Sequence, residues 1–167
     1  MRSTRGLSLV LPLLYATGIA AAHGAERAGD ALARYALQDR GRLAEQMETE
    51  LLALIDASPF ADRFELYRTY NQLTGTWLQM QLSQKLLDEA AAAGSLSQET
   101  SIRTTLRDQA QYALWELDDA RASLERSTPA PDRGEPYRIN LAIRVLLADA
   151  RAIAERVLAD QCEFLRC

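Results

Sequence analysis

The chain has 167 residues and a net charge of −4, and 48% of its residues are hydrophobic. This length suits one domain with a proper hydrophobic core. An acidic chain is a poor match for the phosphate backbone of a nucleic acid, which requires a positively charged face. The sequence therefore predicts a single globular domain that does not bind nucleic acid.

The N-terminus has the three zones of a secretory signal peptide. Arg2 and Arg5 form a positively charged start, residues 6–16 (GLSLVLPLLYA) form an apolar stretch, and Ala20 and Ala22 have the A-x-A spacing that signal peptidase recognises. The apolar stretch is shorter than the roughly 20 residues that a membrane-spanning helix needs. We predict that residues 1–22 are a signal peptide cleaved after Ala22, and the alternative is that they stay as a membrane anchor.

Cleavage would leave residues 23–167 as a periplasmic or secreted domain without a stable membrane span. The loss of two arginines would change the net charge from −4 to about −6. An oxidising compartment would also permit a disulfide between Cys162 and Cys167. Residues five apart on a helix are separated by about 7.5 Å of rise, beyond the ~7 Å limit between the Cα atoms of a disulfide. Either the helix unwinds near Cys162 and the tail folds back, which we favour, or each cysteine pairs with another chain.

Four segments with helical periodicity follow the signal peptide. The first covers about residues 25–57, and the second follows the pair Ser58-Pro59, which we interpret as an N-cap and a first helical residue. Gly94 is predicted to end the second helix in the left-handed conformation. Ser95 and Gln98 have the spacing of a capping box for the third helix, and residues 127–136, rich in proline, form the loop before the fourth.

Each segment carries an apolar seam at spacings of three and four residues, which is typical of helices packed nearly parallel in a bundle. The short turns require neighbouring helices to be antiparallel, so we predict an all-α, up-down-up-down four-helix bundle over residues 23–167. The predicted seams are Leu32, Ala36, Leu43, Met47 and Leu54; Leu66, Tyr70, Leu73, Trp77, Met80 and Leu87; Leu106, Ala110, Ala113, Leu117, Ala120 and Leu124; and Ile139, Ile143, Leu146, Ala150, Ile153, Val157 and Phe164.

The residue types needed for common catalytic and metal sites are missing. His23 is the only histidine. This excludes the Glu-x-x-His pairs of di-iron bundles and the Ser-His or Cys-His pairs in which histidine activates a nucleophile. The many carboxylates lie off the seams among arginines and favour a salt-bridged surface, and we expect Arg144 and Arg151 to pair with nearby acids. We therefore predict no catalytic residues, no metal site and no cofactor.

The second segment holds the most suggestive candidate site. Tyr67, Tyr70, Asn71 and Trp77 lie on two neighbouring stripes of that helix, as the lining of a small-molecule pocket between helices would. The same pattern is also typical of a wide core face with tyrosine hydroxyls reaching solvent. Tyr112 and Trp115 on the third segment could extend an aromatic surface toward a partner.

The leading functional hypothesis is an exported, non-enzymatic helical bundle that binds a protein partner or a second copy of itself. The alternative is a small-ligand binding or sensor-like module that uses the aromatic residues of the second helix. No motif in the sequence assigns the chain to a family.

Overall fold

The computed structural model describes residues 27–167, which form four α-helices and one short 3₁₀-helix, with no β-strand in this range. The predicted signal peptide, its cleavage site and His23 lie outside the described residues. The elements are α2 (Ala28–Ala57), α3 (Phe60–Ala91), α4 (Leu96–Arg126), η1 (Pro131–Arg133) and α5 (Glu135–Leu165).

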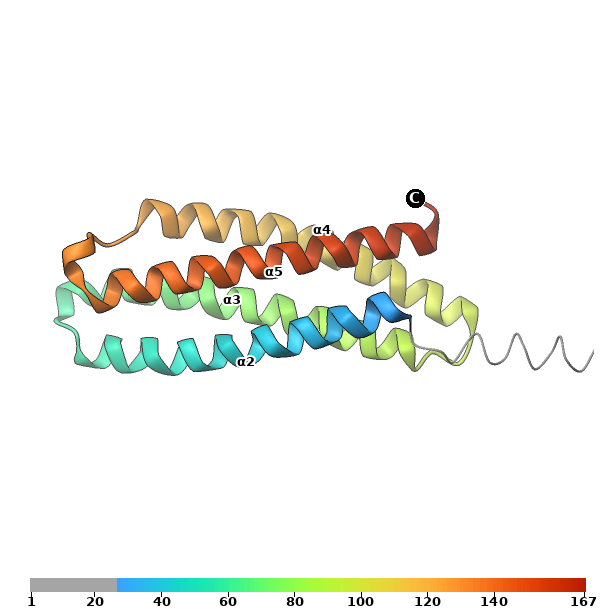
Figure 1. Cartoon of the computed structure of the whole chain (residues 1–167), viewed down its shortest axis with the longest axis horizontal. Helices are drawn as coiled ribbons and strands as arrows, with labels where there is room; N and C mark the ends of the chain where they lie inside the picture. Colours follow the sequence, from blue (N-terminus) through green and yellow to red (C-terminus); the bar gives the residue numbers. More distant parts are fainter. Residues whose placement is uncertain (1–26) are drawn as a thin grey trace, which may run out of the picture.

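The four helices run up, down, up and down and pack in a ring that follows the chain order (Figure 1). Helix α2 packs against α3 and α5, α4 packs against the same two helices, and α3 also touches α5 across the bundle. The α2–α3 turn and the α4–α5 loop lie together at one end, here called the loop end. The α3–α4 turn and the C-terminus lie at the other end, here called the tail end. The predicted antiparallel four-helix bundle is confirmed.

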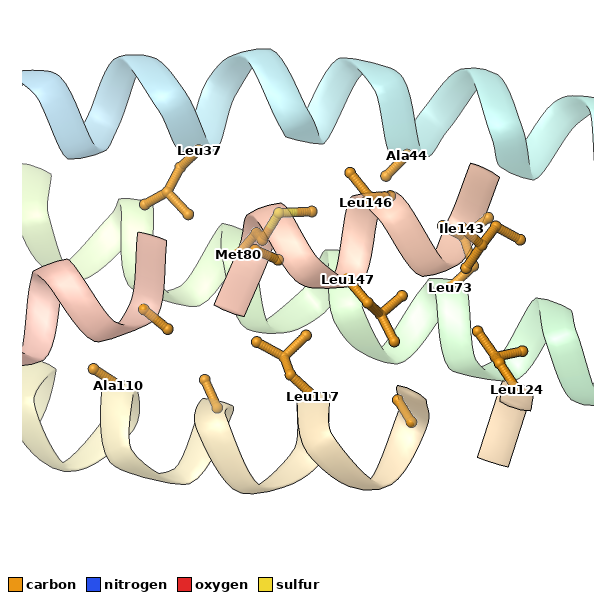
Figure 2. Packing of buried hydrophobic residues seen from close by; sticks show 14 of the residues in the cluster. Leu37, Ala44, Leu73, Met80, Ala110, Leu117, Leu124, Ile143, Leu146 and Leu147 are labelled. Atoms are coloured by element: carbon orange, nitrogen blue, oxygen red, sulfur yellow. The ribbon is translucent and has the colours of Figure 1, made fainter. Parts of the chain in front are cut away.

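One hydrophobic core extends along the bundle, with side chains from all four helices meeting in the centre (Figure 2). The seam predicted on α4 is buried at every position, and most of those on α3 and α5 are buried too. Tyr70, Trp77 and Ile153 lie partly buried at the edge of this core. Over residues 27–167, no helix combines the length and the apolarity needed to cross a membrane.

The seam predicted on α2 is wrong by about one residue. Leu32 is exposed, and Leu43, Met47 and Leu54 are only partly buried. Apolar residues occupy two neighbouring stripes of this helix, and the stripe with smaller side chains faces the centre. The helix is therefore rotated relative to the prediction. Its fully buried apolar residues are Ala33, Leu37, Ala44, Leu51 and Ile55.

Two helix boundaries differ from the sequence prediction in their chemistry. Ser58 does not cap α3: its hydroxyl donates to the carbonyl of Leu54 at 2.7 Å and so closes the end of α2, while Pro59 precedes the first residue of α3. Gly94 does not adopt the left-handed conformation. Helix α3 ends earlier, at Ala91, and Ala92 at its C-cap has a φ of −90°. The amide of Gly94 is instead bound by the side chain of Gln98 in the first turn of α4.

The predicted cap of α4 by Ser95 is confirmed, while the Gln98 side chain binds the residue before the cap. The amide N–H of Gln98 donates to Ser95 Oγ at 3.2 Å, and Gln98 Oε1 in return accepts from the amide of Gly94 at 3.1 Å. The predicted loop between α4 and α5 is also present, although it contains the short helix η1. Gly134 has a φ of +66°, a conformation that glycine adopts without steric cost, and Pro136 then lies in the first turn of α5.

The C-terminal tail folds back and forms a disulfide between Cys162 and Cys167. Helix α5 ends at Leu165, and Arg166 adopts a left-handed conformation with a φ of 57°. This reversal brings the two Cα atoms to 5.0 Å, and the amide of Cys167 donates to the carbonyl of Cys162 at 3.1 Å. The predicted fold-back with a bridge within the chain agrees with this geometry, whereas the helix continues past Cys162 and unwinds only after Leu165.

Ion pairs cross the outer surface between α4 and α5. Arg151 Nε contacts Asp118 Oδ1 at 2.7 Å, and its other nitrogen binds Glu155 on its own helix. Arg144 Nη2 contacts Glu125 Oε1 at 3.2 Å. These two arginines therefore pair with acids, as expected, and the partners come mainly from the adjacent helix.

Candidate functional site

The four residues predicted to line a ligand pocket are divided between the surface and the edge of the core. Tyr67 and Asn71 are exposed, whereas Tyr70 and Trp77 are half-buried and pack against the core. None of the three cavities described below is lined by any of them. A ligand site at these residues stays a prediction.

Tyr70 connects α3 to α2 through its hydroxyl. The hydroxyl donates to Glu48 Oε1 at 2.8 Å, and this hydrogen bond is the main reason that the pKa of Tyr70 is raised above its ordinary value. The contact favours the neutral phenol because the tyrosinate would lose the donor and face a carboxylate. Tyr70 therefore acts as a link between two helices in the folded structure.

A cluster of exposed apolar side chains lies at the loop end of α2 and α3. We call it the aromatic patch and define it as Leu52, Phe60, Phe64 and Tyr67. Phe60 is 90% exposed and Phe64 is 78% exposed, and the other two are exposed as well. Aromatic side chains are enriched at protein interfaces because they bring a large apolar area with few rotatable bonds.

The register between α2 and α3 brings the members of the patch to one face. The hydrogen bond from Tyr70 to Glu48 fixes the pairing of the two helices on one side of Leu52. Arg63 Nη2, which donates to the Asp56 carbonyl at 3.2 Å, fixes it on the other side. Leu52 is therefore level with Tyr67, and Phe64 and Phe60 follow on the same face of α3 at spacings of three and four residues.

Helix α3 carries apolar residues on both of its faces. The inner face supplies buried leucines to the core, while Leu78 and Leu82 are exposed further along the helix, outside the aromatic patch. Helix α4 has a smaller exposed pair, Tyr112 and Trp115. The hydroxyl of Tyr112 is hydrogen-bonded to Glu116, which raises the pKa of Tyr112. The bundle does not need these outward side chains for its own core.

Among the cavities in the described part of the chain, one of about 120 Å³ lies at the loop end. Its lining includes Arg133 and Asp62, which form an ion pair of 2.8 Å. A second of about 10 Å³ lies in the core, too small for more than a water molecule. The third, of about 210 Å³, lies at the tail end and is lined by Arg27, Ala28, Gly29, Asp30, Asp160 and Glu163.

The acidic lining of the tail-end cavity is explained by its position at the start of α2. Asp160 Oδ2 is buried without a hydrogen-bond partner among the described residues. It lies against Gly29, where an added Cβ would be 2.7 Å away. The first turn of a helix has free N–H groups and a positive dipole end, both of which favour a nearby carboxylate. The positive dipole end of α2 therefore favours a carboxylate at the position of Asp160.

A buried polar cluster joins three helices at the tail end. Arg103 of α4 is only 2% exposed, and its Nη2 contacts Asp30 Oδ2 of α2 at 2.7 Å. Its Nη1 donates to Gln161 Oε1 of α5 at 2.9 Å, and its Nε donates to Glu99 Oε1 at 2.7 Å. Burial alone would lower the pKa of Arg103, but the hydrogen bonds to Asp30 and Glu99 outweigh it and raise this pKa.

Phe164 covers the buried cluster from the C-terminal end. Its ring centre lies 4.7 Å from the guanidinium carbon of Arg103 and 4.9 Å from that of Arg27, within the range of a cation–π contact. The predicted apolar role of Phe164 is therefore incomplete, because the ring packs on charged groups. The disulfide between Cys162 and Cys167 closes a ring that contains this residue.

Sequence reasoning missed the buried cluster, although its position was visible. Arg103 precedes Leu106 and Ala110 by three and seven residues, so it extends the seam of α4 toward the N-terminus of this helix. Glu99, four residues before it, has the spacing of a helical ion pair. An arginine on a seam normally signals the end of the core, and only the positions of Asp30 and Gln161 in space show that it is buried.

The described residues contain no group of three or more His, Cys, Asp or Glu side chains arranged to hold a metal ion. Several carboxylates noted in the sequence have basic partners instead: Asp88 pairs with Arg34 at 2.8 Å, and Glu89 lies 3.8 Å from Lys85. The expectation of a salt-bridged surface is met at these positions.

Comparison of the chain with models of protein families, with curated proteins and with solved structures gave no match. Its function is therefore inferred from its own residues.

Proposed function

We propose that the protein is exported and works outside the cytoplasm as a non-enzymatic interaction bundle. The observation that supports this most strongly is the aromatic patch, whose two phenylalanines are 90% and 78% exposed. Contiguous exposed apolar surface on a soluble domain is typical of a protein-binding site. Burying one such ring stabilises a complex by about 1.5–3 kcal/mol.

The rest of the bundle supports a role for the patch in binding. The core is filled by the seams of the four helices, so the folded domain does not depend on Phe60 or Phe64. Surface arginines and acids pair with each other over α4 and α5, which leaves the loop end of α2 and α3 as a distinct apolar area. This area is suited to binding a protein partner.

Export is tested by the mass of the protein recovered from a bacterial host that expresses the whole chain. We expect the periplasmic fraction to contain a species that begins at His23 and has one disulfide. Native mass spectrometry of this fraction reports the processing site, the disulfide and the oligomeric state together. A full-length chain that stays in the cytoplasm would overturn the export proposal.

Binding is tested by a photo-crosslinking amino acid placed at position 64 in the exported protein. We expect discrete crosslinks to one partner, lost when Phe60→Ser is added. The matched control is the same amino acid at position 145 on α5, since Val145 is also exposed. Equal crosslinking patterns from positions 64 and 145 would show that the patch has no special role.

A further inference from the structure

The aromatic patch is bordered by carboxylates. Glu48 and Asp56 lie on α2 one helical turn before and one turn after Leu52, and Glu45 lies on the same side about two turns before it. Glu65 follows Phe64 in the chain but lines the loop-end cavity instead. Within residues 27–167, none of the three carboxylates on α2 forms an ion pair; Glu48 accepts only the hydrogen bond from Tyr70.

The two arginines near the patch donate hydrogen bonds to groups outside its rim of carboxylates. Arg63 Nε donates to the carbonyl of Ser58 at 3.0 Å, and its Nη2 donates to the carbonyl of Asp56. It therefore closes the C-terminal end of α2, where a positive charge is favourable. Arg68 Nε donates to Ser123 Oγ of α4 at 3.1 Å, so the Arg68 side chain is directed toward α4 and not toward α2. Neither guanidinium forms an ion pair with a carboxylate of the rim, so a partner's basic groups can reach these acids without breaking one.

We infer that the aromatic patch binds a basic, amphipathic segment of a partner protein, whose apolar side chains cover Phe60, Phe64, Tyr67 and Leu52 while its lysines or arginines face the acidic rim. This inference rests on the proposed function and specifies the partner. Apolar anchors in the centre with complementary charges at the rim are the usual arrangement of a protein interface.

The same rim disfavours the other occupants. A symmetric dimer would place this patch against its own copy, so Glu45 and Asp56 of one chain would face carboxylates of the other. A membrane surface rich in anionic lipid attracts basic segments, and the acidic rim would be repelled from it. A basic segment of another protein is the occupant that both the apolar centre and the charged rim favour.

The test uses a synthetic amphipathic helix of leucine and lysine as the probe, and a peptide with glutamate in place of lysine as its twin. Fluorescence anisotropy of the labelled peptides reports their affinity for the exported, disulfide-bonded protein. We expect the lysine peptide to bind and the glutamate twin to bind at least tenfold more weakly. Phe60→Ser/Phe64→Ser should weaken the lysine peptide by about tenfold or more, as loss of an interface anchor does.

Two further variants separate the patch from the overall acidity of the chain. Tyr35→Ser/Val145→Ser removes the same number of exposed apolar residues from other positions, and it should leave the affinity unchanged. Glu45→Gln/Asp56→Asn should weaken binding and reduce its dependence on salt. Because all of these side chains are exposed, the melting temperatures of the variants should stay close to that of the parent, which circular dichroism checks.

Several outcomes would overturn the inference. Equal binding of the lysine peptide to the two serine double variants would assign the binding to net charge alone. Dimerisation in gel filtration that Phe60→Ser/Phe64→Ser abolishes would assign the patch to a second copy, and patch-dependent binding to lipid vesicles would assign it to a membrane. If position 64 crosslinks a partner with no basic segment, the proposed function stands and this inference fails; if it crosslinks none, both fail.

Discussion

Arg103 and Asp30, separated by 73 residues in the chain, form a buried ion pair of 2.7 Å that joins α4 to α2. Their side chains are 2% and 5% exposed, so neither charge is solvated by water. Removing one member of a buried pair leaves the other uncompensated, which costs about 3–5 kcal/mol. The pair therefore makes the tail end of the bundle sensitive to single substitutions.

We expect Asp30→Asn to lower the free energy of unfolding by about 3 kcal/mol, the lower part of that range, because Glu99 and Gln161 still bind Arg103. Denaturation in urea measures the change. The matched control is Asp39→Asn on the same helix, since Asp39 pairs with Arg40 on the surface and such pairs contribute at most about 1 kcal/mol. Equal losses for the two variants would contradict a special role of the buried pair.

The success of sequence reasoning depended on how many stripes of a helix are apolar. On α4, one stripe carries most of the apolar residues and the flanking positions are mainly charged or polar, so the seam from Leu106 to Leu124 was predicted correctly. On α2, leucines occupy neighbouring stripes, and choosing the larger side chains put Leu32 inside when it is exposed. The choice between stripes is made by the adjacent helices, which a single sequence does not describe.

The candidate site was predicted in part. The aromatic character of α3 was evident, and Tyr67 belongs to the exposed patch, but Tyr70 faces α2 and Trp77 packs at the core edge. Leu52 was missed because it comes from another helix, and only the register between α2 and α3 places it beside Tyr67. Helix-to-helix register is set by packing over the whole length of the bundle, which local spacing does not reveal.

The disulfide should contribute a small, local stabilisation. Replacing both Cys162 and Cys167 with serine removes a ring of six residues, and the loop-entropy model predicts a loss of about 2 kcal/mol. Hydrogen exchange should become faster at the last turn of α5, where Phe164 covers Arg103, and stay unchanged in the middle of α4. A covalent dimer of the parent protein on a non-reducing gel would show that the cysteines pair between chains.

The two faces of the bundle should respond differently to the loss of a leucine. Leu106 is fully buried on α4, whereas Leu78 is exposed on α3. We expect Leu106→Ala to cost about 3 kcal/mol, since deletion of a buried leucine leaves a cavity, and Leu78→Ala to change stability by less than about 0.5 kcal/mol. Thermal unfolding of both variants tests this, and a large loss from Leu78→Ala would indicate that the outer face of α3 is covered by another molecule.

The hydrogen bond between Tyr70 and Glu48 should make stability fall at alkaline pH. Because the pKa of Tyr70 in the folded protein is above its ordinary value of 10.0, the unfolded chain loses this proton first. The contribution of the bond is therefore fully present below pH 10 and is lost as the pH rises through the raised pKa. Tyr70→Phe should remove this part of the pH dependence, which unfolding curves collected across the alkaline range would measure.

The partner of Tyr70 can be tested separately by titration. The difference in tyrosinate absorbance between the parent protein and Tyr70→Phe isolates the ionisation of this one phenol from the other tyrosines. Glu48→Gln removes the carboxylate that accepts the hydrogen bond, so the pKa of Tyr70 should fall toward its ordinary value. Glu50→Gln, two residues away on α2, serves as the control and should leave it unchanged. An equal shift in both variants would attribute the raised pKa to the overall negative charge of the helix instead of to the contact with Glu48.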